Sequence, residues 1–292
     1  MGGGSALDAA KAIALMAGQN RPLWDFEDVG DNWTRVRAEG MAPVVAVPTT
    51  SGTGSEVGRA SVITQTATAT KKIIFHPGML PSRVICDPAL TIGLPAHITA
   101  AVGMDALSHN LEAFCAPSNH PLADGIALEG MRLVHGYLEQ AVHTPSDIRA
   151  RSAMMSASLM GATAFQKGLG AMHSMAHVIG ARLGAHHGLI NAVVMPYVLV
   201  ANQAAIAERM ATLSRYLDLP SPGFEGVLDW VISLRRTLKI PHTLEALGMD
   251  HSHIETFAPA AVLDPSTGSN PLPFGVDEFS KLFRDAIDGS LT

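Results

Sequence analysis

The sequence predicts an α/β domain followed by an all-helical domain. Residues 43–48 are almost continuously apolar, as in a strand that is buried on both faces of a parallel sheet. Residues 57–74 alternate apolar and hydroxyl-bearing side chains, which favours a hairpin. After Pro95 the apolar residues recur with helical spacing and strand patterns are essentially absent. We therefore predict two domains, residues 1–94 and 95–292.

Composition excludes several classes of protein. The 292 residues are 47% hydrophobic and 16% charged, which suits a globular chain near the size at which two domains form. The formal charge is −6 and no basic cluster with interleaved aromatics occurs, which argues against nucleic acid as a partner. The apolar run 192–200 falls well short of the roughly 20 residues that a membrane span needs, so we expect a buried helix and no membrane partner.

The cysteines and the N-terminus predict a compartment. Cys86 and Cys115 lie in apolar contexts, so we expect buried free thiols rather than a disulfide. The first residues show no basic segment before an apolar one, as a signal peptide would have. Both observations favour a cytoplasmic protein.

Two elements of the first domain could bind a phosphate group. Three glycines and Ser5 precede a helical run over residues 6–17, and the free amides of a helix start bind anions; the alternative is a flexible tail. Residues 49–56 place hydroxyls and glycines at the carboxyl end of the first strand, where cofactors bind, although such clusters are more often plain loops.

A second buried strand is expected over residues 83–88, and Lys71 is expected to be a solvated charge.

The second domain is predicted to be a series of helices. Glycine and proline residues interrupt the helical pattern near residues 220–223 and 264–273. The expected helices cover residues 98–116, 121–142, 145–166, 189–202, 204–217, 226–238 and 276–287.

Histidines gather in two stretches of this domain. His173 and His177 are four residues apart, and Asp105 and His109 repeat that spacing, so each pair shares one helix face. A single histidine on an apolar helix is usually an ordinary core or surface residue. Burying Asp105 with several imidazoles, however, is costly without a partner, and a divalent cation is the most economical one.

These motifs resemble a known family. Asp-Ala-x-x-His at 105–109, Gly-x-x-His-x-x-x-His at 170–177 and His-Gly at 187–188 are similar to the iron-containing (group III) alcohol dehydrogenases. The resemblance implies a Rossmann-like cofactor domain before a metal-binding helical domain, as in dehydroquinate synthase. It also implies that His177 is catalytic and faces the nicotinamide, with the metal held by Asp105, His109, His173 and His187.

The resemblance extends to the cofactor site. The family's Gly-Gly-Gly-Ser-x-x-Asp-x-x-Lys element and its Pro-Thr-Thr-x-x-Thr-Gly-Ser-Glu loop both match. In the family several strands and helices precede the glycine element, so the chain resembles one that lacks the strands holding the adenosine half. We expect weak dinucleotide binding by the isolated chain. The implied cofactor-binding residues are Gly3, Gly4, Ser5, Asp8, Thr49, Thr50, Thr53, Lys72, Thr91 and Leu94.

The implied function is hydride transfer between a small alcohol or aldehyde and NAD or NADP. The metal, Fe(II) with Zn(II) as the alternative, would polarise the substrate oxygen. Glu112 could support a liganding histidine, Phe165 and Met172 could line the substrate pocket, and a homodimer is expected from the family. Two alternatives remain within the wider superfamily, maleylacetate reductase and glycerol dehydrogenase. A third, of another class, is a non-catalytic metal-binding or oligomerisation module.

Overall fold

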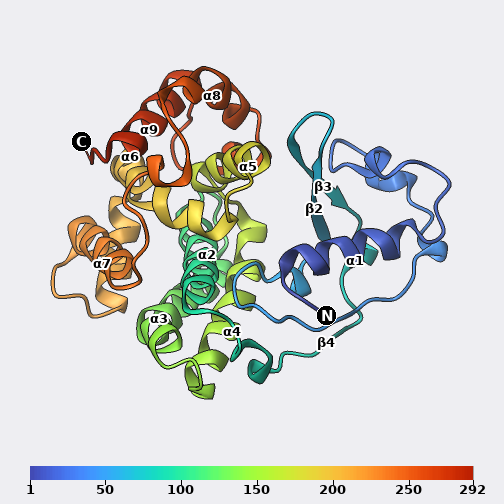
Figure 1. The fold of residues 1–292 in the computed structure, drawn as a ribbon, viewed down its shortest axis with the longest axis horizontal. Helices are drawn as coiled ribbons and strands as arrows, with labels where there is room; N and C mark the ends of the chain where they lie inside the picture. The colour runs from blue at the N-terminus through green and yellow to red at the C-terminus, as the bar shows by residue number, and fades with distance from the viewer. Residues whose placement is uncertain (292) are drawn as a thin grey trace.

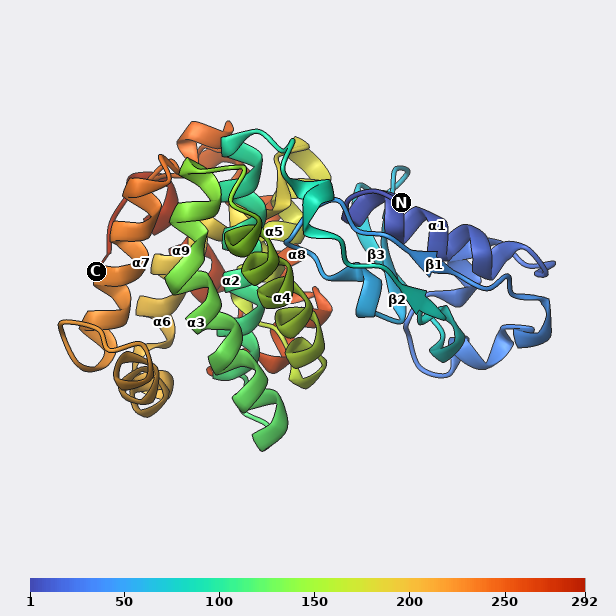
Figure 2. The same cartoon turned by 90° about the horizontal axis from the view of Figure 1, so that it is seen from below.

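The structure, a computed structural model, describes residues 1–291. It has two lobes that lie side by side (Figures 1 and 2). The smaller lobe contains α1 and the four strands, and the larger lobe contains α2 to α9. The larger lobe begins with α2 at Ala96, directly after the predicted boundary. An α/β portion thus precedes an all-helical one.

The smaller lobe is built on two separate two-stranded sheets. Helix α1 (Gly4–Met16) follows the glycine turn. Strand β1 (Val45–Ala46) pairs in parallel with β4 (Arg83–Val84), and β2 (Ala60–Gln65) pairs antiparallel with β3 (Thr70–Phe75). A small apolar core lies between α1 and the hairpin, formed by Leu15, Phe26, Ile74 and Met79.

Three predictions for this lobe were wrong. The strands expected over 43–48 and 83–88 are each only two residues long, and Val45 is 55% exposed where full burial was expected. Cys86, expected to be buried, is exposed, whereas Cys115 is buried as predicted and both thiols are free. The reason is the same in each case. Within the described residues the sheet that contains β1 and β4 has only these two strands. Few neighbouring side chains are therefore available to bury an apolar run in either strand.

The larger lobe is a bundle around α2 (Ala96–Cys115), in which every residue from Thr99 to Cys115 is buried. Helices α3, α4 and α6 pack directly against it. The two predicted helices 189–202 and 204–217 are one continuous helix, because no glycine or proline separates them. The other bounds are α3 Pro121–His143, α4 Ile148–Ala164, α5 Ala171–Leu183, α6 His187–Tyr216, α7 Gly223–Thr237, α8 Ile254–Val262 and α9 Val276–Asp288.

Helix α6 is the one described helix that is long and apolar enough to cross a membrane. In its most apolar window, 67% of the helix is buried inside the structure. Its apolar side chains pack into the main core of the larger lobe, for example Val193, Val194 and Leu199. This packing is that of a core helix.

Candidate metal centre

Four side chains from three helices meet in the larger lobe. Asp105 and His109 lie one turn apart on α2, His173 lies on α5, and His187 is the first residue of α6. One ligand atom from each of the four lies within 4.8 Å of the others. The first three are buried, and the side chain of His187 is 30% exposed. The structure therefore brings together the four residues that were predicted as metal ligands.

A glycine lets α6 approach α2 closely enough to complete this group. A Cβ atom on Gly188 would lie 2.3 Å from the carbonyl oxygen of Ala101 and 2.9 Å from Cβ of Asp105. Any larger residue would push the start of α6 away from α2. The close approach places His187 Nε2 only 3.6 Å from Asp105 Oδ1.

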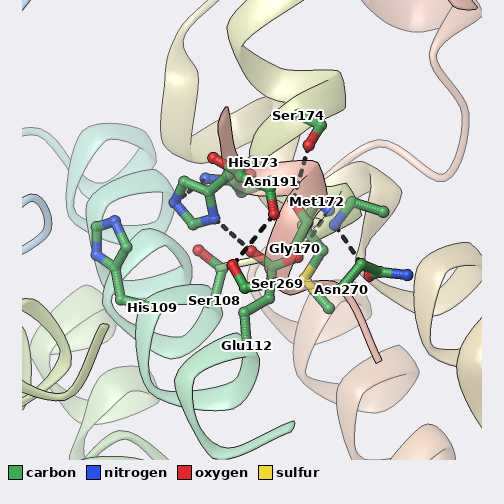
Figure 3. A network of polar contacts seen from close by, with 12 residues as sticks. Ser108, His109, Glu112, Gly170, Met172, His173, Ser174, Asn191, Ser269 and Asn270 are labelled. Carbon is green, nitrogen blue, oxygen red and sulfur yellow. Dashed lines mark hydrogen bonds and ion pairs between the residues drawn. The ribbon is translucent and has the colours of Figure 1, made fainter. Parts of the chain in front are cut away.

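Hydrogen bonds outside the group orient two of the rings. His109 Nδ1 lies 3.2 Å from the carbonyl oxygen of Gly52, which can only accept, so Nδ1 carries the proton and Nε2 carries the lone pair. His173 Nδ1 lies 2.6 Å from Glu112 Oε2 (Figure 3). When that carboxyl is ionised, His173 must be the donor, and its Nε2 also becomes a ligand nitrogen.

Glu112 also fixes the start of α5. Its Oε1 accepts a hydrogen bond from Met172 N at 2.7 Å, and Asn270 Oδ1 accepts one from Ala171 N at 3.1 Å (Figure 3). Both bonds satisfy amides that a helix start leaves without a partner. Glu112 therefore ties α2 to α5 while it orients His173, in line with the expected supporting role. Met172 is buried beside Glu112 and away from solvent.

Burial keeps the imidazoles of the group neutral. It lowers the pKa of His109, lowers that of His173 well below its ordinary value, and lowers that of His187 to about 4. For Asp105, burial acts to raise the pKa, but the nearby histidines and the amide of Asn191 outweigh it and hold the pKa below its ordinary value. Burial raises the pKa of Glu112 to about 8, against the pull of its backbone N–H donors.

Asn191 belongs to the centre although the sequence did not predict it. Its Nδ2 lies 2.9 Å from Asp105 Oδ1 and 3.3 Å from Nε2 of both His173 and His187, while its own Oδ1 is buried without a partner. Asn191 follows His187 by four residues, so helical spacing could have found it. One amide nitrogen thus serves three lone-pair atoms. A centre so rich in acceptors and so poor in donors suits a divalent cation with oxygen and nitrogen ligands.

His177 lies beside the group and is held by Asp264, an acid that the sequence did not predict either. Its Nδ1 lies 2.8 Å from Asp264 Oδ2, and its ring stacks on that of His187 with centroids 5.4 Å apart. His177 hydrogen-bonds its Asp264 partner without joining the four-residue group. Asp264 comes 87 residues later, at the start of the turn Pro265–Ser269, and nothing in the sequence marks it. His186 is exposed on the preceding loop.

The predicted cofactor residues at the start of α1 face the hydroxyl loop after β1. Gly2 N donates to Val47 O and Thr49 N donates to Gly2 O, both within 3.1 Å. A Cβ on Gly4 would lie 2.5 Å from Cγ2 of Thr53, and one on Gly3 would lie 3.2 Å from Cγ2 of Thr50. The close approach of the two segments therefore requires small residues. Ser5 is exposed at this helix start.

The remaining predicted cofactor residues have other partners. Asp8 accepts hydrogen bonds from Ser55 Oγ at 2.6 Å and Val62 N at 3.1 Å, so it braces the lobe. Thr91 is buried and donates to Pro88 O at 2.8 Å. Leu94 lines a small cavity at the junction of the lobes.

The two neighbouring lysines of β3 have different surroundings. Lys72 pairs with Glu27 at 2.8 Å, on the opposite face of the hairpin from Lys71. Lys71 was expected to be solvated, but it is partly buried. Burial lowers its pKa, opposed by the charge of Asp8, and Lys71 in turn acts to lower the pKa of His187. Lys71 is therefore the lysine that lies nearer the centre.

A centre of one carboxylate and three imidazoles, in a chain that begins with a glycine-rich turn before a helix, is typical of a metalloenzyme with a nucleotide cofactor domain. Two family models match the chain: "Iron-containing alcohol dehydrogenase" over residues 1–88 and "Fe-containing alcohol dehydrogenase family, C-terminal" over residues 99–287. The chain belongs to the iron-containing alcohol dehydrogenase family. The predicted family and fold class are confirmed, as is the predicted function of a metal-dependent alcohol oxidoreductase.

Relatives support this assignment along the whole chain. A 4-hydroxybutyrate dehydrogenase of Cupriavidus necator is 39% identical, covering 98% of this chain and 76% of the relative. An NAD-dependent methanol dehydrogenase of Bacillus methanolicus is 36% identical over the same shares. A solved 1,3-propanediol oxidoreductase superposes with a TM-score of 0.91 at 35% identity, covering 98% of this chain and 75% of that one. The chain thus spans about three-quarters of the length of these relatives.

Proposed function

We propose that Asp105, His109, His173 and His187 hold a divalent metal, with Fe(II) as the physiological ion and Zn(II) as the alternative. The chain would transfer hydride between a small alcohol or aldehyde and NAD or NADP. The observation that carries the proposal is the buried group itself, whose four ligand atoms lie within 4.8 Å of one another. The oxygen and nitrogen donor set fits such ions.

When bound, the metal supplies Lewis acidity toward the substrate oxygen, and the nicotinamide accepts or donates the hydride. The residues of this chain set the charge and the geometry of the site in which the metal and the nicotinamide would act. Asp105 is ionised, since its pKa is held low, and offsets part of the charge of a cation. The carbonyl of Gly52 holds His109 in ligand orientation, and Glu112 does the same for His173 when its carboxyl is ionised. Metal ligands of this kind depend strongly on such partners.

We propose that His177 handles the substrate proton. Its Nδ1 faces the Asp264 carboxylate, which can only accept, so Nε2 is the basic atom. The side chain is 12% exposed and stacks on His187, so His177 lies between the centre and solvent. A proton received at Nε2 would be stabilised by the Asp264 charge.

We propose that the hydroxyls of Thr49, Thr50 and Thr53 and the free amides at the start of α1 bind the phosphates and ribose of the cofactor. The start of α1 has no side-chain cap, which leaves its first N–H groups available to an anion. Lys71, whose charge acts on His187, would add a positive charge near the metal centre, whereas Lys72, the lysine first predicted at the cofactor, pairs with Glu27.

The substrate we propose is a short-chain alcohol or aldehyde, in keeping with the names of the relatives. The intact group of one acid and three histidines favours this reading over a maleylacetate reductase or a glycerol dehydrogenase. We further propose a cytoplasmic enzyme, able to form a homodimer, that acts without nucleic acid or membrane partners.

Metal replacement tests the proposal. The chain would be stripped of metal, loaded anaerobically with Fe(II) or Zn(II), and assayed by nicotinamide absorbance with short alcohols and aldehydes. We expect one ion per chain and activity that depends on it. Asp105→Asn should lose the ion, and His186→Gln, a change in the exposed neighbour outside the group, should keep it. Tight metal binding without turnover with either nucleotide would favour the non-catalytic alternative.

A further inference from the structure

One face of α1 meets the segment of chain that follows β1. Gly4, Asp8 and Lys11 have helical spacing, so they lie one above the other along this face. Helix α1 is in contact with β2, and Figure 1 shows the two elements beside each other. The facing segment consists of the hydroxyl loop (residues 49–56) and the residues that lead into β2. Gly4 allows the close approach to Thr53, and the next two residues of the face hold the segment.

Lys11 is a buried lysine whose ammonium group faces backbone carbonyls. The residue is 1% exposed, and its Nζ donates to the carbonyl oxygens of Ser55 at 2.9 Å, Gly58 at 3.3 Å and Ala60. All three N–H groups of the ammonium therefore have an acceptor. These acceptors run from the hydroxyl loop to the first residue of β2. One side chain thus fixes the course of this part of the chain.

Asp8 holds the same segment from the preceding turn of α1. Its Oδ1 accepts a hydrogen bond from Ser55 Oγ at 2.6 Å, and its Oδ2 accepts one from Val62 N at 3.1 Å. The backbone oxygen of Asp8 accepts from Ser61 Oγ at 2.8 Å. Asp8 Oδ1 also lies 3.4 Å from Lys11 Nζ, so the two charges offset each other. Ser55 is therefore held twice, through its hydroxyl and through its carbonyl oxygen.

The hydroxyl loop has little backbone pairing of its own. Within residues 1–291, none of the N–H groups of residues 50–54 donates to a backbone carbonyl. The loop packs tightly on the helical lobe instead, since a Cβ on Gly54 would lie 2.2 Å from Cβ of Ala162 in α4. This packing blocks movement toward α4 but does not hold the loop against α1. The hydrogen bonds of Lys11 and Asp8 do.

A buried ammonium group is costly compared with an apolar side chain of similar size. Burial lowers the pKa of Lys11, opposed by the charge of Asp8, and an apolar residue would fill the space without removing a charge from water. Arg235 of α7 provides a comparison, because it is 3% exposed and also donates to backbone carbonyls. Its acceptors lie within the helical lobe, whereas those of Lys11 belong to the hydroxyl loop and the start of β2.

We propose that Lys11 is a positioning residue for the cofactor: together with Asp8 it holds the hydroxyl loop against α1, so that Thr50 and Thr53 stay beside the helix start. The inference rests on the proposed function, in which this loop and the start of α1 bind the dinucleotide together. Neither Lys11 nor Asp8 has to touch the cofactor. Without the ammonium group, the two halves of the binding site can separate.

Hydrogen exchange tests this role in the chain without metal or cofactor. Lys11→Met keeps most of the side-chain volume and removes three hydrogen bonds, so the amides of residues 49–62 should exchange about tenfold faster than in the parent. Those of α5 and α6 should change by less than about twofold. Arg235→Met is the matched control, since it removes a buried cation from other carbonyls, and exchange of residues 49–62 should not change. Equal exchange of this segment in the parent and in Lys11→Met would overturn the proposal.

Dinucleotide binding tests the consequence for the cofactor. Titration with NADH and with NADPH, followed by nicotinamide fluorescence, should give a Kd about tenfold higher for Lys11→Met and an unchanged Kd for Arg235→Met, although both variants lose thermal stability. If Lys11→Met does not fold, Ser55→Ala serves instead; it removes a bond to Asp8 and should raise the exchange rate and the Kd about threefold.

The two measurements distinguish two kinds of failure. Faster exchange in Lys11→Met with an unchanged Kd would refute the positioning role and leave the proposed function intact. If the parent binds neither nucleotide, the proposed function is wrong and the positioning role fails with it, even where exchange shows that Lys11 holds the loop.

Discussion

Glu112→Gln is a sharp test of how the metal centre is built. The glutamate uses both oxygens on buried donors, Oε2 on His173 Nδ1 at 2.6 Å and Oε1 on Met172 N at 2.7 Å. Glutamine has the same shape but only one acceptor. If its oxygen faces His173, its amide opposes Met172 N–H; if it is turned round, its amide opposes His173. One buried donor therefore loses its partner in either arrangement.

The size of the effect follows from that lost bond. Above its pKa of about 8 Glu112 is ionised, and there a buried hydrogen bond to its charge contributes about 1.5–3 kcal/mol. If metal binding requires the His173 tautomer with a free lone pair on Nε2, the free energy of metal binding becomes less favourable by this amount. The dissociation constant should then rise by about 10- to 150-fold, a range that overlaps the effect usual for partners of metal-bound histidines.

The assay is competition for Zn(II) with a chromophoric chelator, on the metal-free chain and on the variant, at a pH above 8 where Glu112 is ionised. Asp264→Asn is the matched control, because it alters a buried acid that also hydrogen-bonds a histidine, but one outside the group of four. It should lower turnover and leave Zn(II) affinity unchanged. An affinity for Glu112→Gln within twofold of the parent would refute the argument that Glu112 sets the orientation of His173.

Three further predictions concern the same region. The imidazoles of the group have lowered pKa values, about 4 for His187, so the metal-free chain should lose stability as the pH falls from 6.5 towards 4, seen as a falling melting temperature; a flat profile would contradict this. Lys71→Met should raise the KM for the dinucleotide severalfold, whereas Lys72→Met, which breaks only the Glu27 pair, should not. Gly188→Ala should weaken metal binding by at least tenfold in the chelator assay, because its Cβ would collide with Ala101 O; unchanged affinity would show that α6 can shift freely.

The sequence predicts the centre better than its surroundings. Helical spacing places Asp105 with His109 on one helix face, and the resemblance supplies His173 and His187, each from a motif of its own. Asp264 could not be found, since it reaches His177 from a turn that only the tertiary fold brings near. The mistakes at Val45 and Cys86 have another cause: an apolar pattern indicates a tendency to be buried, but burial also requires a neighbouring layer.

The two lobes are chemically interdependent at the centre. The carbonyl of Gly52, in the hydroxyl loop of the smaller lobe, fixes the tautomer of His109 in the larger one. Gly52 itself is pressed against α2, since a Cβ there would lie 2.8 Å from Val102. The loop that we propose binds the cofactor is thus also a support of the metal site. It follows that the helical lobe by itself cannot hold His109 as the full chain does. If this loop moves when the cofactor binds, the hydrogen bond between Gly52 O and His109 Nδ1 would transmit that movement to the metal site.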